Sequence, residues 1–218
     1  MKYQSNPLTD QRCSGRRHWS SLFRPAILAA ILAMQVSGCA LLKPAPAPRD
    51  TFELSAPTSF DAIRGSTSAQ ILIKQPNALK SIDSDRIVVR TSPSEITYMS
   101  GAQWSDNVPR MVQAKLVEAF ENTGATGATA KPGDGLVIDY QIISDIRRFE
   151  IDANGQGQAK IEISLKLLAD RTGKVVESRI FSASAPVLSK GGAGAVEAFD
   201  KAFADLSNDI VKWVLSRV

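Results

Sequence analysis

Cysteine and histidine carry the most versatile catalytic and metal-binding side chains, and in this chain they all lie near the beginning. Cys13, His18 and Cys39 are the only three among 218 residues. The chain after Cys39 therefore lacks the ligands of a His/Cys metal site and the partners of a Ser-His-Asp or Cys-His nucleophile. It also cannot form an internal disulfide. We expect no metal, no cofactor and no catalytic residue there, although carboxylate, lysine or tyrosine chemistry stays open.

The chemistry that remains is that of the Cys39 thiol. Residues 1–24 are polar and basic, and an apolar run follows from Pro25 to Val36, which is too short to span a bilayer. A basic region, an apolar region and small residues before a break are typical of an export signal. Ser37-Gly38-Cys39 resembles the lipobox of bacterial lipoproteins, in which the thiol takes a diacylglyceryl group by forming a thioether.

We therefore expect residues 1–38 to be a lipoprotein signal peptide and Cys39 to become the acylated first residue. Small side chains at positions 37 and 38 would let the peptidase approach the backbone, and two or more acyl chains make such an anchor stable. In the alternative, residues 26–42 remain as an uncleaved helix, because Leu41 and Leu42 extend the apolar run.

Residues 39–50 form the predicted lipidated N-terminus and tether. Prolines alternate with alanines from Lys43 to Arg49, a pattern that favours polyproline II and a reach of roughly 20 Å. A disordered spacer is the other interpretation. Residue 40 is alanine and not aspartate. By the sorting habit of Gram-negative lipoproteins, this predicts an outer-membrane location with the domain facing the periplasm.

The charge balance separates the leader from the rest of the chain. Residues 1–38 contain five basic residues and one acidic residue, whereas the remainder contains 21 of each. The near-neutral remainder gives no support for nucleic-acid binding driven by bulk charge. Its length and apolar content predict one globular domain over residues 51–218.

Hydrophobic patterning within this domain predicts mostly strands. Residues Gln158–Ala169 alternate between apolar and polar side chains, and turn signals at Asn154-Gly155 and at 170–173 place them in an antiparallel meander. We expect one dry and one wet sheet face, and the wet face is a candidate docking surface. The predicted strands are Thr51–Ser55, Gln70–Gln75, Arg86–Arg90, Glu95–Met99, Leu136–Phe149, Gln158–Ala169 and Lys174–Val187.

Two segments carry helical spacing. The first is Asp106–Asn122, with Asp106 as the expected N-cap and Gly124 after its end. The second is Ala195–Arg217, preceded by residues 190–194, whose glycines predict a flexible joint. The predicted fold is α+β, a two-layer sandwich in which two amphipathic helices pack on one face of a mainly antiparallel sheet.

Tyr98 and Trp104 are the candidate partner-binding residues. They flank a Ser-Gly-Ala-Gln stretch that we expect to be a loop between a strand and a helix. Large aromatic residues in a loop either anchor it to the core or contact a partner, and the sequence leaves both interpretations open. The Arg147-Arg148 pair likewise predicts a solvated edge or bulge, or else a contact to a partner or lipid headgroup.

The order of these segments resembles the ABC-type transport auxiliary lipoprotein family over roughly residues 39–218. The resemblance rests on Asp85–Arg90, Glu95–Tyr98, Gln103–Asp106, Pro109–Val112, Asp170–Val176 and the lipobox. It implies a non-enzymatic subunit of an ABC/Mce system that moves phospholipids or other hydrophobic molecules. It also implies a Mce-domain protein and an ABC permease/ATPase pair as partners.

Two other functions stay open at this point. One is a helper lipoprotein for outer-membrane or cell-wall assembly, which gene neighbourhood would distinguish. The other is a carboxylate-dependent hydrolase, which needs two carboxylates converging in a cleft. The sequence does not decide whether the chain forms a homo-oligomer.

Overall fold

The computed structural model describes residues 48–60, 63 and 65–218. The chain divides into two compact units, Met1–Pro46 and Ala47–Val218, and the account below concerns the second. The predicted signal peptide, Cys39 and most of the predicted tether lie outside the described residues.

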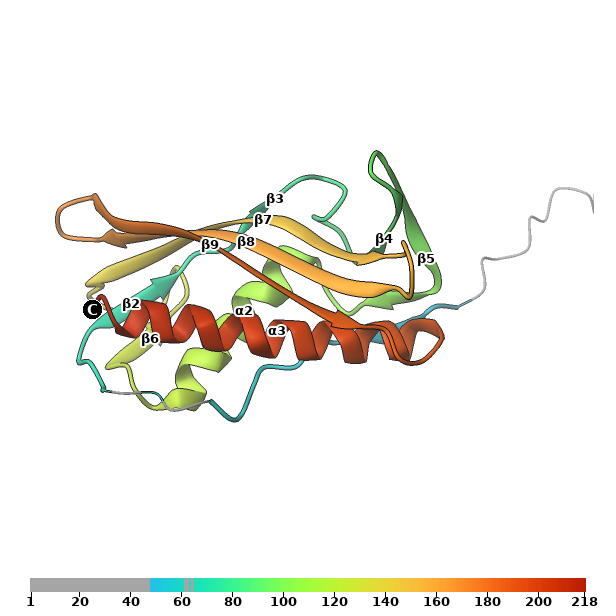
Figure 1. The fold of residues 1–218 in the computed structure, drawn as a ribbon. Helices are drawn as coiled ribbons and strands as arrows, with labels where there is room; N and C mark the ends of the chain where they lie inside the picture. Colours follow the sequence, from blue (N-terminus) through green and yellow to red (C-terminus); the bar gives the residue numbers. More distant parts are fainter. Residues whose placement is uncertain (1–47, 61–62, 64) are drawn as a thin grey trace, which may run out of the picture. The chain divides into compact units, whose positions relative to one another are not determined.

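Three long antiparallel strands form the largest part of the sheet, from its middle to one border (Figure 1). They are β7 (Tyr140–Asp152), β8 (Gln158–Ala169) and β9 (Lys174–Pro186), and they pair in chain order. Gly155 and Gly173 occupy the two turns with φ angles of 74° and 66°, a left-handed conformation that glycine adopts without strain. The predicted meander is confirmed, and the predicted bounds of β8 agree with the structure.

The other edge of β7 is shared by three short strands that follow one another along it. These are β2 (Gln70–Ile73), β3 (Asn77–Ala78) and β4 (Arg86–Ser92), and all three run parallel to β7. β2 pairs with the beginning of β7, β3 with its middle and β4 with its end. The sheet is therefore mixed, although its longest pairings are antiparallel as predicted.

The remaining strands extend the sheet from β4 and from β2. β4 and β5 (Glu95–Trp104) form the predicted hairpin, β1 (Asp50–Phe52) adds parallel to β5, and β6 (Ala128–Ala130) adds parallel to β2. The expected loop between Tyr98 and Trp104 is instead part of β5. This segment holds extra residues relative to β4, because Arg86 lies opposite Gln103 whereas Val88 lies opposite Tyr98.

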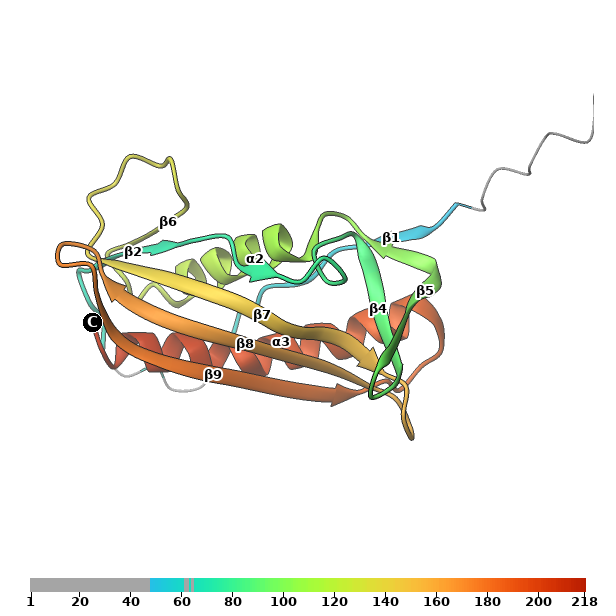
Figure 2. The ribbon, with the colours of Figure 1, turned by 90° about the horizontal axis from the view of Figure 1, so that it is seen from above.

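Both helices cover the same face of the sheet (Figures 1 and 2). The first, α2 (Val108–Thr123), ends as predicted at Gly124, whose φ of 59° lets its N–H bond to the carbonyl of Glu121. Its N-cap is Asn107 and not the expected Asp106. The Asp106 carboxylate accepts the Asn107 N–H at 2.7 Å and so braces the residue that precedes the helix.

The second helix, α3 (Gly191–Leu215), begins four residues earlier than expected, so the prediction of a flexible glycine joint is wrong. Close packing explains the glycines. A Cβ at Gly192 would lie 2.6 Å from the Phe52 ring and 2.7 Å from Ala102 Cβ, and one at Gly194 would lie 2.0 Å from the Ser189 carbonyl oxygen. The glycines let the first turn of α3 approach its neighbours.

An aromatic cluster lies in the core between the sheet and α3. Trp104 of β5 meets Phe149 of β7 and Phe199 of α3 edge-on, at ring-centroid distances of 5.8 and 5.3 Å, and the two phenylalanine rings stack at 4.7 Å. Such pairs stabilise by about 0.5–1.5 kcal/mol each beyond their buried area. The α+β two-layer prediction is confirmed, with both helices on the dry face.

Candidate functional site

The two aromatic candidates do not form one site. Trp104 has 1% of its surface exposed and belongs to the aromatic core. Its burial supports the interpretation that this side chain fixes its segment to the core, and not the interpretation that it contacts a partner. Tyr98 lies opposite Val88, which is aligned with Glu150 of β7 on the face away from the helices. The extra residues in β5 shift the side-chain alternation between the two aromatics, and this places them on opposite faces.

Tyr98 is half-buried and held by polar contacts. Its hydroxyl donates to the Ser81 carbonyl oxygen at 3.5 Å, and the Arg86 guanidinium lies 4.6 Å from the ring centroid. A cation in this position is attracted by the negative face of the ring. Tyr98 thus lies at one end of a polar surface on which the side chains of four strands meet.

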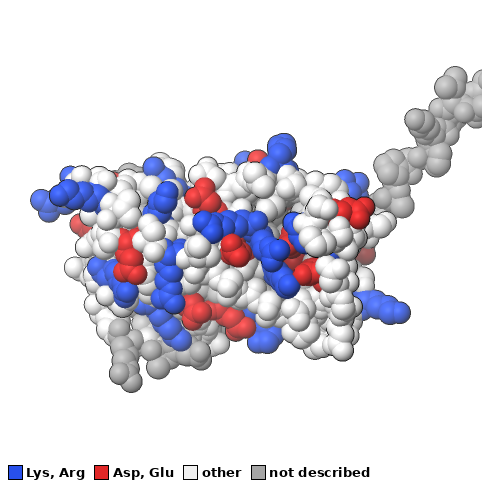
Figure 3. All heavy atoms as spheres, turned by 45° about the horizontal axis from the view of Figure 1, so that its top comes forward, with Lys and Arg blue, Asp and Glu red and all other residues white. Residues whose placement is uncertain are grey.

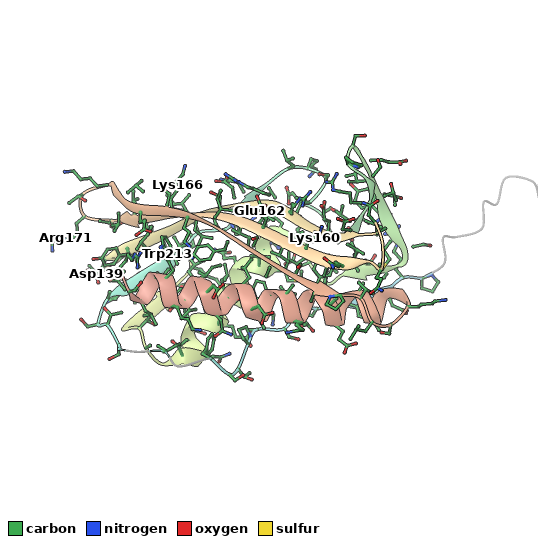
Figure 4. The ribbon with its side chains drawn as sticks, in the orientation of Figure 1. Asp139, Lys160, Glu162, Lys166, Arg171 and Trp213 are labelled. Atoms are coloured by element: carbon green, nitrogen blue, oxygen red, sulfur yellow. The ribbon has the colours of Figure 1, made fainter. Side chains whose placement is uncertain are left out.

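This polar surface, which we call the charged face, is the side of β4, β5, β7 and β8 that the helices leave uncovered. Figure 3 shows basic and acidic side chains interleaved over it. Lys160, Glu162 and Lys166 project from β8 on this side (Figure 4), as the sequence alternation predicts. Its charged members include Arg90, Arg147, Arg148, Glu150, Asp152, Lys160, Glu162 and Lys166.

Glu150 is the centre of the charged face and is only 2% exposed. Arg90 of β4 donates to both of its carboxylate oxygens, from Nε at 2.7 Å and from Nη2 at 2.8 Å, and Arg148 Nε lies 3.5 Å away. The hydrogen bond to Glu150 raises the pKa of Arg90. This two-pronged contact ties β4 to the end of β7, and sequence reasoning missed it because the partners are sixty residues apart.

Two further ion pairs lie beside Glu150. Lys160 Nζ donates to Asp152 at 2.7 Å, and Arg147 approaches Glu162 at 3.7 Å. The lysine and the Asn154 backbone and side-chain N–H groups hold the pKa of Asp152 far below its usual range. Arg147 is the extra residue of a bulge in β7, as one of the sequence interpretations predicts. Each carboxylate in these pairs is therefore held by a cation.

A hollow of about 330 Å³ lies on the charged face across β8. Two cations, one carboxylate and two hydroxyls border it, from Arg148, Lys160, Glu162, Ser182 and Ser184. Among the described residues, no group of three or more His, Cys, Asp or Glu side chains could hold a metal ion. The fixed, mixed charges are suited to recognising a polar surface of either sign.

Two other hollows lie near opposite ends of α3. One, of about 510 Å³, is lined by Asp139, Tyr140, Arg171 and Val218 among others, and Figure 4 shows Asp139 and Arg171 at that end. The other, of about 220 Å³, is lined largely by apolar atoms near the first half of the helix, including those of Leu188, which is 83% exposed. None of the helices in the described part of the chain has the length and apolar character to cross a membrane.

Comparisons with known proteins agree with this architecture. The family described as ABC-type transport auxiliary lipoprotein component matches residues 52–211. An uncharacterized protein of Bradyrhizobium diazoefficiens is 31% identical over 98% of this chain, which spans 58% of that protein's length.

Solved structures are similar as well. The crystal structure of protein XCC0632 from Xanthomonas campestris is 31% identical, with a TM-score of 0.72 over 77% of this chain and 95% of that one. A hypothetical protein from Chlamydia trachomatis, at 8% identity, has a TM-score of 0.50 over 68% of this chain and 96% of its own, and shares the fold alone.

Proposed function

The chain belongs to the ABC-type transport auxiliary lipoprotein component family, and from this membership we propose that it is a non-catalytic docking subunit of an ABC/Mce-type transport system. The cargo would be a phospholipid or another hydrophobic molecule. The match over residues 52–211 is the observation that carries the proposal, since it spans the sheet and most of α3. ATP hydrolysis would belong to a separate subunit, and this chain would act by binding partners at a membrane.

The anchor in this proposal is Cys39. Acylation of its thiol would hold the domain at the outer membrane on the periplasmic side, and residues 43–49 would separate the domain from the bilayer by roughly 20 Å. In the described part of the chain, β1 begins at Asp50, directly after this tether segment. A short, proline-rich connection of this kind limits how far the domain can move from its membrane.

Fractionation of cells that express Cys39→Ser tests the anchor. We expect the variant to lose lipid labelling and to leave the membrane fraction. Cys13→Ser is the matched control, because it removes the other thiol of the chain and should change neither property. Intact mass of the membrane-extracted protein should show a chain that begins at an acylated Cys39. An unmodified chain beginning at Met1 would refute this part of the proposal.

The charged face is the docking surface that we propose for the Mce-domain partner. The strands set the positions of its side chains, and ion pairs between neighbouring strands hold several of them in place. Arg148 approaches Glu150 and still keeps 43% of its side chain exposed, so a partner can reach it. Charged groups at an interface steer association and select the partner more than they add affinity. Tyr98 borders the same surface, so we include it in the docking surface and assign Trp104 to the core.

A binding assay with the purified Mce-domain partner tests this surface. Lys166→Glu reverses an exposed charge of β8 on the charged face, and we expect about tenfold weaker binding at low salt and a smaller difference at high salt. Lys201→Glu is the matched control, because Lys201 is 67% exposed on α3, on the opposite side of the sheet. Equal binding by the wild type and both variants would exclude the charged face as the docking surface.

Co-purification from membranes tests the function as a whole. A tagged full-length chain should recover the Mce-domain protein together with the ABC permease and ATPase subunits. Recovery of outer-membrane or cell-wall assembly machinery in their place would contradict the proposal.

A further inference from the structure

β9 forms one border of the sheet and leaves its outer edge unpaired. Within the described residues, its 13 residues pair only with β8, and Figure 2 shows it along the border with no strand beyond it. A free edge presents a row of backbone N–H and C=O groups that another strand can bind. Proteins usually shield such an edge with short strands, prolines, bulges or charges. Here Lys174 and Pro186 lie at the two ends of the strand, Val176 is an extra residue relative to β8, and Glu177 and Arg179 are the charges between the ends.

Three exposed side chains in the first half of this strand are branched and aliphatic. Val175, Val176 and Ile180 expose 51%, 45% and 53% of their surfaces. They lie within six residues of one another and surround Ser178. An unpaired backbone edge combined with exposed branched aliphatic side chains is the composition of a strand that pairs with a partner strand.

The charges near Ser178 indicate which strand would fit. Glu177 and Arg179 lie opposite Leu167 and Leu165 of β8, so both project on the helix-covered side of the sheet. Glu177 accepts hydrogen bonds from Arg217 and Trp213, yet 40% of its side chain stays exposed and accessible to a second cation. Arg179 is exposed, and its guanidinium lies 5.0 Å from the Phe181 ring centroid.

These two charges make the edge complementary to itself. If two copies of β9 pair antiparallel about a twofold axis beside Ser178, Glu177 of each copy lies opposite Arg179 of the other. The same register brings Val176, which is the extra residue of a bulge against β8, nearest to Ile180. Opposite charges that face each other across a sheet stabilise the pairing of the two strands, and contact between exposed aliphatic side chains adds buried apolar area.

We propose that two copies of this chain pair through β9 in this register and form one continuous sheet. The inference does not depend on the transport function. A strand edge is a narrow contact, smaller than the interfaces that support stable dimers, so the dimer is weak, with a Kd in roughly the micromolar range or above. The charged face of both copies would then lie on the same side of the shared sheet.

Cysteine cross-linking of the purified full-length chain tests the register. Directly opposed residues of antiparallel strands have Cα atoms about 4.5–5.5 Å apart, which is within the range that a disulfide bridges. Under mild oxidation, Ser178→Cys should therefore form a covalent dimer. Ser184→Cys is the matched control: it is an exposed serine of the same strand and the same sheet face, and in this register the two copies of residue 184 lie roughly 40 Å apart.

The native cysteines contribute the same background to both variants. A dimer yield at least tenfold higher for Ser178→Cys than for Ser184→Cys supports the proposal. Equal yields, or no dimer with Ser178→Cys, would overturn it.

Charge reversal tests the chemistry of the contact separately. In the Ser178→Cys background, Arg179→Glu places like charges opposite each other and should lower the dimer yield at least tenfold. Arg179→Lys keeps the positive charge and should retain most of it. Thermal melting followed by circular dichroism checks that both variants fold. An unchanged dimer yield with Arg179→Glu, in a folded variant, would contradict the self-complementary pairing.

Discussion

The same strands present two different surfaces, one toward the helices and one toward solvent. On the helix side, alternate residues of β8 are almost fully buried from Ala159 to Leu167. On the charged face, Lys160 and Glu162 remain partly exposed and make ion pairs. Buried apolar and aromatic contacts contribute several kcal/mol per residue, whereas exposed ion pairs contribute about 1 kcal/mol or less. The helix side therefore accounts for most of the stability, and the charged face is free to specify binding.

Among these variants, Trp104→Ala should cause the largest loss in the free energy of unfolding. It removes a fully buried ring that contacts two phenylalanines, and large-to-alanine changes in a core cost about 3–5 kcal/mol. Tyr98→Ala, in the same strand but on the charged face, should cost less than half as much. Urea unfolding measures both, and equal losses would break the distinction between the two faces.

Glu150→Ala should show that one position on the charged face behaves like a core residue. The change leaves Arg90 without its carboxylate partner. Breaking a fully buried ion pair lowers the free energy of unfolding by about 3–5 kcal/mol. Because the Arg90 side chain is 23% exposed, we expect a somewhat smaller loss of about 2–4 kcal/mol. Glu162→Ala is the control, since Glu162 is 33% exposed and pairs with Arg147 at 3.7 Å. A loss as small as that of the control would mean that the Arg90 pair is solvent-screened.

Ser144→Ala should stabilise the protein, in contrast to the other substitutions on the helix side. Ser144 is 1% exposed, and its hydroxyl has no hydrogen-bond partner among the described residues. An unsatisfied buried hydroxyl is unfavourable, so removing it should raise the free energy of unfolding by up to about 1 kcal/mol. Ile142→Ala, two residues earlier on the same side, should instead lower it by about 2–5 kcal/mol. Destabilisation by Ser144→Ala would indicate that the hydroxyl is satisfied in solution.

Lys160→Met should have the smallest effect of these variants, and its loss of stability should be greatest near neutral pH and disappear in acid. The pKa of Asp152 is lowered chiefly by the hydrogen bond from Lys160. A lowered carboxyl pKa stabilises the fold above the unfolded-state value, and this stabilisation is lost as pH falls through the folded-state value. Without the lysine, the Asp152 pKa should rise towards its usual value, and the difference in stability from the wild type should shrink as pH falls. An NMR titration of Asp152 checks this, and an unchanged pKa would contradict the assigned cause.

Local patterns in the sequence predict much of the fold. The alternation in residues 158–169, the turn at Asn154-Gly155 and the apolar stripes of two helices all act over a few residues, and they correspond to β8, its preceding turn, α2 and α3. The glycines before Ala195 predict a flexible joint, whereas the structure places them in the first turn of α3. Their cause is the approach of Phe52 and Ala102 to Gly192, and these neighbours are distant in the sequence.

The features of the fold that the sequence does not predict depend on pairing between strands that are far apart in the chain. Three short strands bind one edge of β7 in parallel, and no local pattern specifies which strand binds where. The same limit applies to the candidate site. Polar positions on β8 predict a charged face, but the burial of Glu150 depends on Arg90, and the separation of Tyr98 from Trp104 depends on how β5 pairs with β4.

The bulge at Arg147 has a consequence for the whole of β7. Before it, the residues that face the helices are Ile142, Ser144 and Ile146, whereas after it they are Phe149 and Ile151. The single extra residue thus changes the phase of the strand from even to odd numbers. Without Arg147, Arg148 would follow Ile146 directly, and the pairs that Ile146, Arg148 and Phe149 make with β8 would form a regular ladder, with Phe149 still facing the helices. A one-residue deletion at the bulge should consequently be tolerated better than one elsewhere in β7, where it would turn the side chains that follow to the wrong face.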